Sequence, residues 1–91
     1  MKSKYFLEFE EKFMVIEREY DSLLRMSRRD GRKPLYLIVS EDKLRSMQAN
    51  LNSLLDTYAD RLHNGERMEA VNAIAFLSNA IDIAIASPRS I

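Results

Sequence analysis

The side chains best suited to holding a metal ion are two carboxylates and the single histidine, Asp56, Asp60 and His63. On one continuous helix, their spacing of four and then three residues would place all three on one face. Carboxylate and imidazole ligands spaced in this way can bind a divalent cation. That face, however, lies opposite the apolar stripe of the same helix, where it is open to water and no fourth ligand is at hand. We therefore predict no metal site, and we expect His63 to lie at a helix C-terminus, where a histidine suits the dipole.

Five glutamates lie close together near the N-terminus, and paired carboxylates can act as acid and base catalysts. Such catalysis needs a cleft that moves their pKa values apart. These glutamates are interspersed with lysines and arginines, which is typical of a solvated helix surface: Glu8, Glu10, Glu11, Glu17 and Glu19. The chain also has no cysteine, and two glycines are too few for a glycine-rich phosphate loop. The sequence thus predicts a protein without catalysis and without a cofactor.

The most distinctive charged feature is a basic segment over residues 25–33. It holds five cations and one acid, although the whole chain has no net charge: Arg25, Arg28, Arg29, Arg32 and Lys33. Three interpretations stay open, namely a solvated helix end, a contact for an acidic protein surface, and a contact for nucleic-acid phosphates. Two observations weigh against nucleic acid: the preceding residues are acidic, and no aromatic residues alternate with the arginines to stack on bases. We take the five cations as candidate partner-binding residues.

The elements that must position these groups are mostly helical. Over about residues 3–29, apolar side chains recur three and four positions apart, as on one face of a helix: Phe6, Phe9, Phe13, Ile16, Tyr20 and Leu23. These aromatic residues should supply much of the core volume. We expect the helix to end near Asp30 and Gly31, because a glycine there can adopt the left-handed conformation that ends helices.

Two more helices are predicted further along the chain. Ser40 is a suitable N-cap for a helix over about residues 41–63, whose apolar stripe is Leu44, Met47, Leu51, Leu54, Tyr58 and Leu62. A third helix, over about 66–86, is apolar nearly all round, so it needs neighbours on two sides. Its larger apolar residues are Met68, Val71, Ile74, Phe76, Leu77, Ile81, Ile83 and Ile85. Residues 87–91 are predicted to be a tail.

Between the first two helices lies an unbroken apolar run, residues 35–39, after Pro34 has barred helix continuation. A β-prone run without alternation predicts a short extended or β segment buried on more than one side. It either pairs with the same segment of a second copy or closes one end of the bundle within a monomer. The predicted fold is therefore all-α, a three-helix bundle with a long first helix and this short segment, in one domain over residues 1–91.

These elements carry more apolar surface than so small a chain can bury alone. A homodimer would cover it, either by helix packing across a two-fold axis or by strand pairing. The candidate interface residues are Leu35, Leu37, Val39, Phe76 and Ile83. We therefore predict a small interaction or regulatory protein that binds another macromolecule as a homodimer. A protein is the favoured partner, and nucleic acid is the alternative.

Composition and segment lengths give an expected location. With 46% apolar and 31% charged residues, the chain resembles ordinary soluble globular proteins. The first residues contain acids where a signal peptide needs an apolar run. The most apolar window, residues 70–86, is short and holds four polar residues, so we expect no membrane span and no membrane partner. The absence of cysteine fits a reducing compartment, and the expectation is a cytoplasmic protein.

Overall fold

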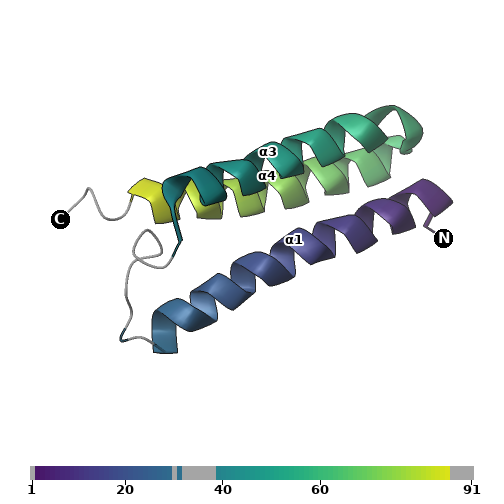
Figure 1. The fold of residues 1–91 in the computed structure, drawn as a ribbon. Helices are drawn as coiled ribbons and strands as arrows, with labels where there is room; N and C mark the ends of the chain where they lie inside the picture. The colour runs from purple at the N-terminus through teal and green to yellow at the C-terminus, as the bar shows by residue number, and fades with distance from the viewer. Residues whose placement is uncertain (1, 30, 32–38, 87–91) are drawn as a thin grey trace.

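The computed structural model shows a bundle of helices, in which α3 and α4 form an antiparallel hairpin and α1 packs against it (Figure 1). The structure describes residues 2–29, 31 and 39–86. Helix α1 spans Lys4–Arg29, α3 spans Glu41–Tyr58 and α4 spans Asn64–Ala86, with a 3-10 turn η1 at Ala59–Arg61. The predicted all-α class is confirmed for this part of the chain, which contains no strand. Of the predicted extended segment, residues 35–38 lie outside the described residues.

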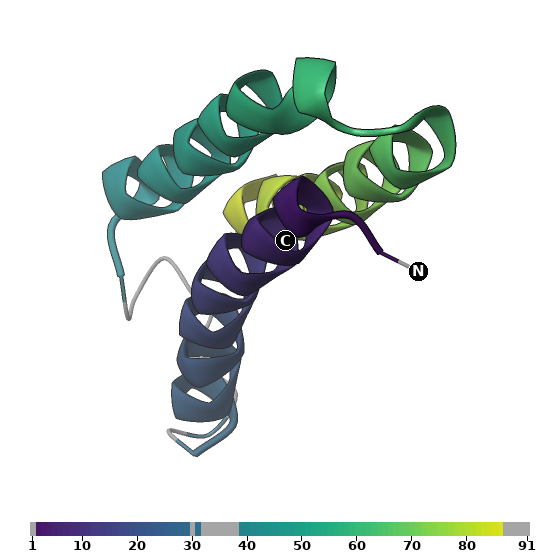
Figure 2. The same ribbon diagram turned by 90° about the vertical axis from the view of Figure 1, so that its right-hand side faces the viewer.

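The direction of α1 follows from where its N-terminus lies. This end is beside the turn that joins α3 to α4, so α1 runs parallel to α4 and antiparallel to α3 (Figure 1). Two views at right angles agree that the last turns of α1 diverge from the hairpin (Figures 1 and 2). The N-terminal half of α1 therefore packs most closely on its neighbours, and its basic end projects.

Local signals in the sequence decide where α1 and α3 begin and where α1 ends. Ser3 is the N-cap of α1, because its Oγ accepts a hydrogen bond from the backbone N–H of Phe6 at 3.2 Å. Helix α1 ends at Arg29, and Gly31 has a φ of 80°, in the left-handed region that was expected there. Ser40 is confirmed as the N-cap of α3, since its Oγ accepts from the N–H of Lys43 at 3.2 Å.

The second helix ends earlier than predicted. Helix α3 stops at Tyr58, and after η1 the chain becomes extended at Leu62, with φ of −96° and ψ of 146°. Leu62 stays buried, and its extended backbone leads the chain back into α4. Arg67 of α4 donates to the carbonyl of Ala59 at 2.8 Å and to that of Leu62 at 3.4 Å, which satisfies acceptors left free by the helix end. Helix α4 consequently starts at Asn64, two residues before the predicted start.

The core consists of the stripes that the periodicity predicted. All six stripe residues of the second helix are buried, and those of α1 are buried or half-buried against the core. Helix α4 contributes one face, made of Ala70, Ile74, Leu77, Ile81 and Ile85. Helical spacing alone therefore identified the inward faces of α1 and α3.

A polar network fixes how α3 sits along α4. The amide of Gln48, which is buried in α3, donates to the carbonyl of Ser78 at 2.9 Å and to Asp82 at 2.8 Å. Arg45 donates to both Gln48 at 2.9 Å and Asp82 at 3.0 Å. The hydrogen bond from Gln48, and to a smaller extent the one from Arg45, lowers the pKa of Asp82. A buried amide needs such partners, so sliding α3 by one turn along α4 is unfavourable.

Helix α4 is covered on one side only within this part of the chain. Phe76 is 79% exposed and Ile83 is 68% exposed, and Met68 and Val71 also face outward. The helix is long and apolar enough to cross a membrane, a test that the mostly buried core helices of soluble proteins also pass, and only 28% of its most apolar window is buried here. The two-sided packing expected for this helix is therefore incomplete within the described residues.

We predict that Leu51→Ala lowers the free energy of unfolding by about 2–5 kcal/mol, because it removes a fully buried side chain and leaves a cavity. Urea unfolding followed by far-UV circular dichroism measures this change. Val15→Ala is the matched control, because Val15 is 62% exposed on α1, and it should change stability by less than about 0.5 kcal/mol. Equal losses in the two variants would contradict the core described above.

Candidate functional site

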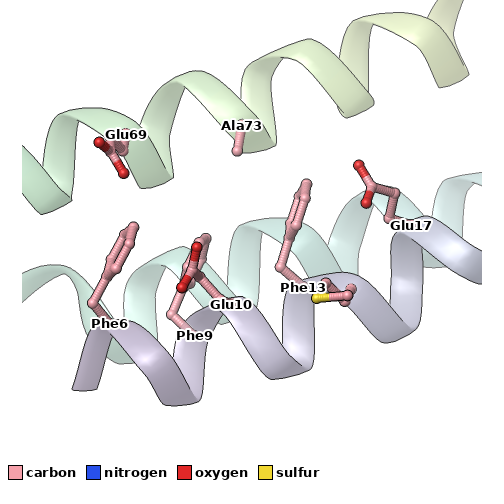
Figure 3. A pocket seen from close by; sticks show the side chains of 8 residues that line it. Phe6, Phe9, Glu10, Phe13, Glu17, Glu69 and Ala73 are labelled. Carbon is pink, nitrogen blue, oxygen red and sulfur yellow. The ribbon is translucent and has the colours of Figure 1, made fainter. Parts of the chain in front are cut away.

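A groove with an aromatic floor lies between α1 and α4, with a volume of about 240 Å³. Phe6, Phe9 and Phe13 of α1 stack along its floor, with ring centroids 6.1 Å and 5.8 Å apart. Figure 3 shows the rings of Phe6 and Phe13 pointing from α1 toward α4. Ala73 lines the α4 side, and its short side chain leaves room above the rings. Phe6 and Phe9 are buried in the core, so the half-buried ring of Phe13 is the part of this floor that an incoming side chain can contact.

Three carboxylates surround this floor, and we call the whole feature the acidic groove. Glu10 and Glu17 lie two turns apart on the same side of α1, and Glu69 lies on α4. The carboxylate of Glu17 points toward α4 and that of Glu69 points toward α1 (Figure 3). Among the described residues, Glu17 and Glu69 have no hydrogen-bond or ion-pair partner. The groove is therefore apolar at its floor and negative at its edge.

One cation of the chain itself already occupies an end of the acidic groove. The ammonium of Lys2 lies 2.9 Å and 3.1 Å from the two carboxylate oxygens of Glu10. The same nitrogen is 5.7 Å from the centroid of the Phe6 ring, a distance at which a cation is attracted to the ring face. Carboxylate and ring together therefore form a site that a primary ammonium fits.

Two contacts, which we call the α1–α4 ties, hold the walls of the groove in place. At one end, the backbone N–H and the hydroxyl of Ser3 donate to the two carboxylate oxygens of Glu66, each at 2.8 Å. At the other end, the hydroxyl of Tyr20 donates to the carbonyl of Ala80 at 3.2 Å. The stacked phenylalanines lie between these two points on α1. The ties thus hold the helices at both ends of the groove.

Glu66 satisfies two helix N-termini at once. Besides Ser3, its carboxylate accepts the backbone N–H of His63 at 3.4 Å, as in a capping box at the start of α4. Hydrogen bonds to the charged form, above all the one from the Ser3 backbone N–H, lower the pKa of Glu66. The carboxylate is therefore ionised at neutral pH when it holds Ser3.

Helix α1 is also fixed against α3, on the side away from the groove. The rings of Phe9 and Tyr58 meet edge to face with centroids 6.3 Å apart, and the Tyr58 hydroxyl donates to Glu8 at 3.2 Å. Burial, and next the bond to Glu8, raise the pKa of Tyr58. Lys43 of α3 pairs with Glu19 at 2.8 Å. Glu8 and Glu19 thus serve packing, whereas Glu10 and Glu17 remain beside the groove.

The predicted partner-binding cations lie away from this groove. Arg25, Arg28 and Arg29 are exposed in the last two turns of α1, and none of them forms an ion pair with another described residue. Arg32 and Lys33 lie outside the described residues. The helix end that projects in Figures 1 and 2 is therefore positively charged and open to solvent.

The predicted dimer-interface residues divide in the same way. Phe76 and Ile83 are exposed and lie seven residues apart, so they share one face of α4. Val39 is half-buried against the core of its own chain. Leu35 and Leu37 lie outside the described residues.

The spacing that suggested a metal site is not preserved. Because α3 ends at Tyr58, Asp60 falls in η1 and His63 follows it, so Asp56, Asp60 and His63 no longer share a helix face. No three acids or histidines of the described part are placed to hold a metal ion. The expectation that His63 lies at a helix C-terminus is wrong, because its carbonyl accepts the N–H of Arg67 at 2.7 Å at the start of α4.

Sequence reasoning missed the acidic groove because it treated its glutamates as a solvated surface. A partial signal was present, since Glu10 and Glu17 are seven residues apart and border the phenylalanine stripe. Glu69 and Ala73 gave no such signal, because they belong to another helix. No protein-family model, curated protein or solved structure matches the chain.

We predict that Glu66→Gln destabilises the protein at neutral pH and flattens its stability–pH profile in acid. The folded pKa of Glu66 lies below the unfolded one, so its stabilisation is complete above the unfolded pKa. That stabilisation is lost as the pH falls through the folded pKa. The Glu66→Gln variant has no carboxylate at this position, so it should not show this loss. Thermal unfolding at a series of pH values measures both effects.

Glu69→Gln is the matched control on the same helix, because Glu69 accepts no hydrogen bond from the described residues. Its melting temperature should follow the pH as that of the unmodified protein does. A Glu66→Gln protein with an unchanged acid profile would show that the tie to Ser3 contributes nothing.

Proposed function

We propose that this chain is a small non-catalytic interaction protein that forms a homodimer and binds a protein partner. The observation that carries the proposal is the one-sided burial of α4, which leaves Phe76 and Ile83 in water. Phe76 and Ile83 share one face of α4 with the exposed Asn72 and Asn79, and exposed apolar patches bordered by polar residues mark interaction surfaces. In a two-fold symmetric dimer, the same face of α4 is buried in both copies, so a single contact covers the exposed apolar side chains of both chains.

The lining of the acidic groove supports binding rather than catalysis. It consists of phenylalanine rings, carboxylates, a methionine and an alanine, and the lining residues include no imidazole, hydroxyl or amine. Covalent catalysis pairs a nucleophile with a base, and acid–base catalysis needs carboxylates whose pKa values are set apart. A groove of this composition is better suited to holding a side chain.

We predict that the protein has twice the mass of one chain at micromolar concentration, by size-exclusion chromatography with light scattering. The double variant Phe76→Glu/Ile83→Glu should be monomeric, because it places four charges in the contact. Val15→Glu is the control, since Val15 is comparably exposed but lies on α1, and it should remain dimeric. A monomeric mass for the unmodified protein would contradict the homodimer. The exposed apolar face of α4 would then be a binding surface for another partner.

Nucleic-acid binding is the second candidate, and a separate observation favours it. Arg25, Arg28 and Arg29 are exposed on the projecting end of α1 and have no ion-pair partner among the described residues. Together with Arg32 and Lys33 in the sequence, they form a concentrated positive segment. Phosphate oxygens are suited to such unpaired guanidinium groups.

For this candidate, we predict that affinity for duplex DNA falls steeply as salt is raised. Each phosphate contact contributes roughly −0.9 to the slope of log K against log salt concentration. The triple variant Arg28→Ala/Arg29→Ala/Arg32→Ala should reduce that slope, whereas Arg18→Ala, which removes an exposed arginine outside the segment, should not. Fluorescence anisotropy measures both, and the absence of binding at low salt rules this candidate out.

A further inference from the structure

We infer that the acidic groove binds a cationic, apolar helical segment of a partner protein. Its basic side chains would pair with Glu17 at one end of the groove and with Glu69 and Glu10 toward the other (Figure 3). An aliphatic side chain between them would lie on the ring of Phe13. This inference names the chemistry of the protein partner and so rests on the proposed interaction function. It does not require the homodimer, because the groove is complete within one chain.

The first argument is charge complementarity. Glu17 and Glu69 approach the groove from opposite helices and have no partner among the described residues (Figure 3). Each of these unpaired carboxylates can form an ion pair with a basic side chain of an incoming segment. An anionic or neutral segment offers no such gain, so the groove discriminates by sign of charge.

The second argument is the position of Lys2. Its ammonium already binds Glu10 at 2.9 Å while it lies over the Phe6 ring at 5.7 Å from the centroid. The chain therefore shows at the Phe6 end, where Glu69 also lies, the kind of contact that we infer for Glu17 at the Phe13 end (Figure 3). Lys2 also neutralises Glu10, so it competes with an incoming cation for that carboxylate.

The third argument is the geometry of the groove. It lies between two helices that run in parallel and are held together at both ends by the α1–α4 ties. A third apolar stripe laid along two such helices is the packing of an ordinary helix bundle. Glu10 and Glu17 are seven residues apart, about 10 Å along the helix. A bound helix with basic residues seven positions apart and leucines between them matches this spacing.

The test uses a synthetic helical peptide with one leucine face bordered by lysines seven residues apart. Its comparison peptide has glutamate in place of every lysine. Isothermal titration with the full chain should show binding of the lysine peptide that weakens with salt, and no binding of the glutamate peptide. Equal binding of both peptides, or no binding of the lysine peptide, overturns the inference.

Three substitutions make the test specific to the groove. Glu17→Gln and Glu69→Gln should each weaken binding about threefold, as expected for a partly exposed ion pair. Lys2→Gln should strengthen binding about threefold, because it frees Glu10. The control is Glu11→Gln, which removes an exposed glutamate of α1 that does not line the groove, and it should have no effect. Weaker binding in the Lys2 variant contradicts the competing role of Lys2.

A steric variant checks the apolar floor without changing charge. Ala73→Leu fills the space above the phenylalanine rings and should weaken binding at least tenfold, with circular dichroism confirming that the variant is folded. Unchanged binding in this variant places the peptide elsewhere and overturns the inference.

The mass of the protein separates this inference from the homodimer. A Phe76→Glu/Ile83→Glu monomer that still binds the lysine peptide supports the groove whatever the fate of the dimer. If the protein is dimeric but binds no peptide, the homodimer is supported and the inferred binding in the acidic groove is overturned. If Glu17→Gln/Glu69→Gln makes the protein monomeric without peptide, the groove is filled by a second copy and the inferred partner is wrong.

Discussion

The contact between the N-termini of α1 and α4 is the constraint on which the rest of the arrangement depends. The Glu66 carboxylate binds the N-cap residue of α1 and also supports the first turn of α4, where a negative charge suits both helix dipoles. This contact makes α1 parallel to α4 and brings Phe6 to the start of the groove. With Tyr20 bound to Ala80 further along, the phenylalanine rings lie between two fixed points.

The core explains why this arrangement leaves apolar surface uncovered. The hairpin of α3 and α4 is fixed by the Gln48 network, and α1 packs on it through Phe9 and Tyr58. Three helices can bury one face of each, but α4 is apolar on more than one face. The surplus apolar surface is therefore a consequence of the sequence of α4, and it is the physical basis for proposing association.

Charge is separated along α1 in a way that gives its two halves different roles. The N-terminal and middle turns carry Glu10 and Glu17 beside the acidic groove, and the C-terminal end carries exposed arginines that project from the bundle. The net charge of zero therefore conceals one negative and one positive surface. A negative surface attracts a cationic partner and a positive surface attracts an anionic one. The inferred protein partner would therefore bind toward the N-terminal end of α1, and the candidate nucleic acid would bind at its C-terminal end.

Local sequence determined the features that depend on neighbouring residues. Helical periodicity identified the inward stripes of α1 and α3, Ser40 marked the start of α3, and Gly31 marked the end of α1, because each acts within one or two helical turns. Tertiary structure decided what lies far apart in the chain. Ser3 and Glu66 are 63 residues apart, and Glu69 joins Glu17 only when α4 packs beside α1. Tertiary packing also ended α3 at Tyr58, where burial of Leu62 and the bonds from Arg67 outweighed helix continuation. No local pattern encodes such contacts, so the sequence could indicate only the α1 side of the acidic groove, and the fold decided the α4 side.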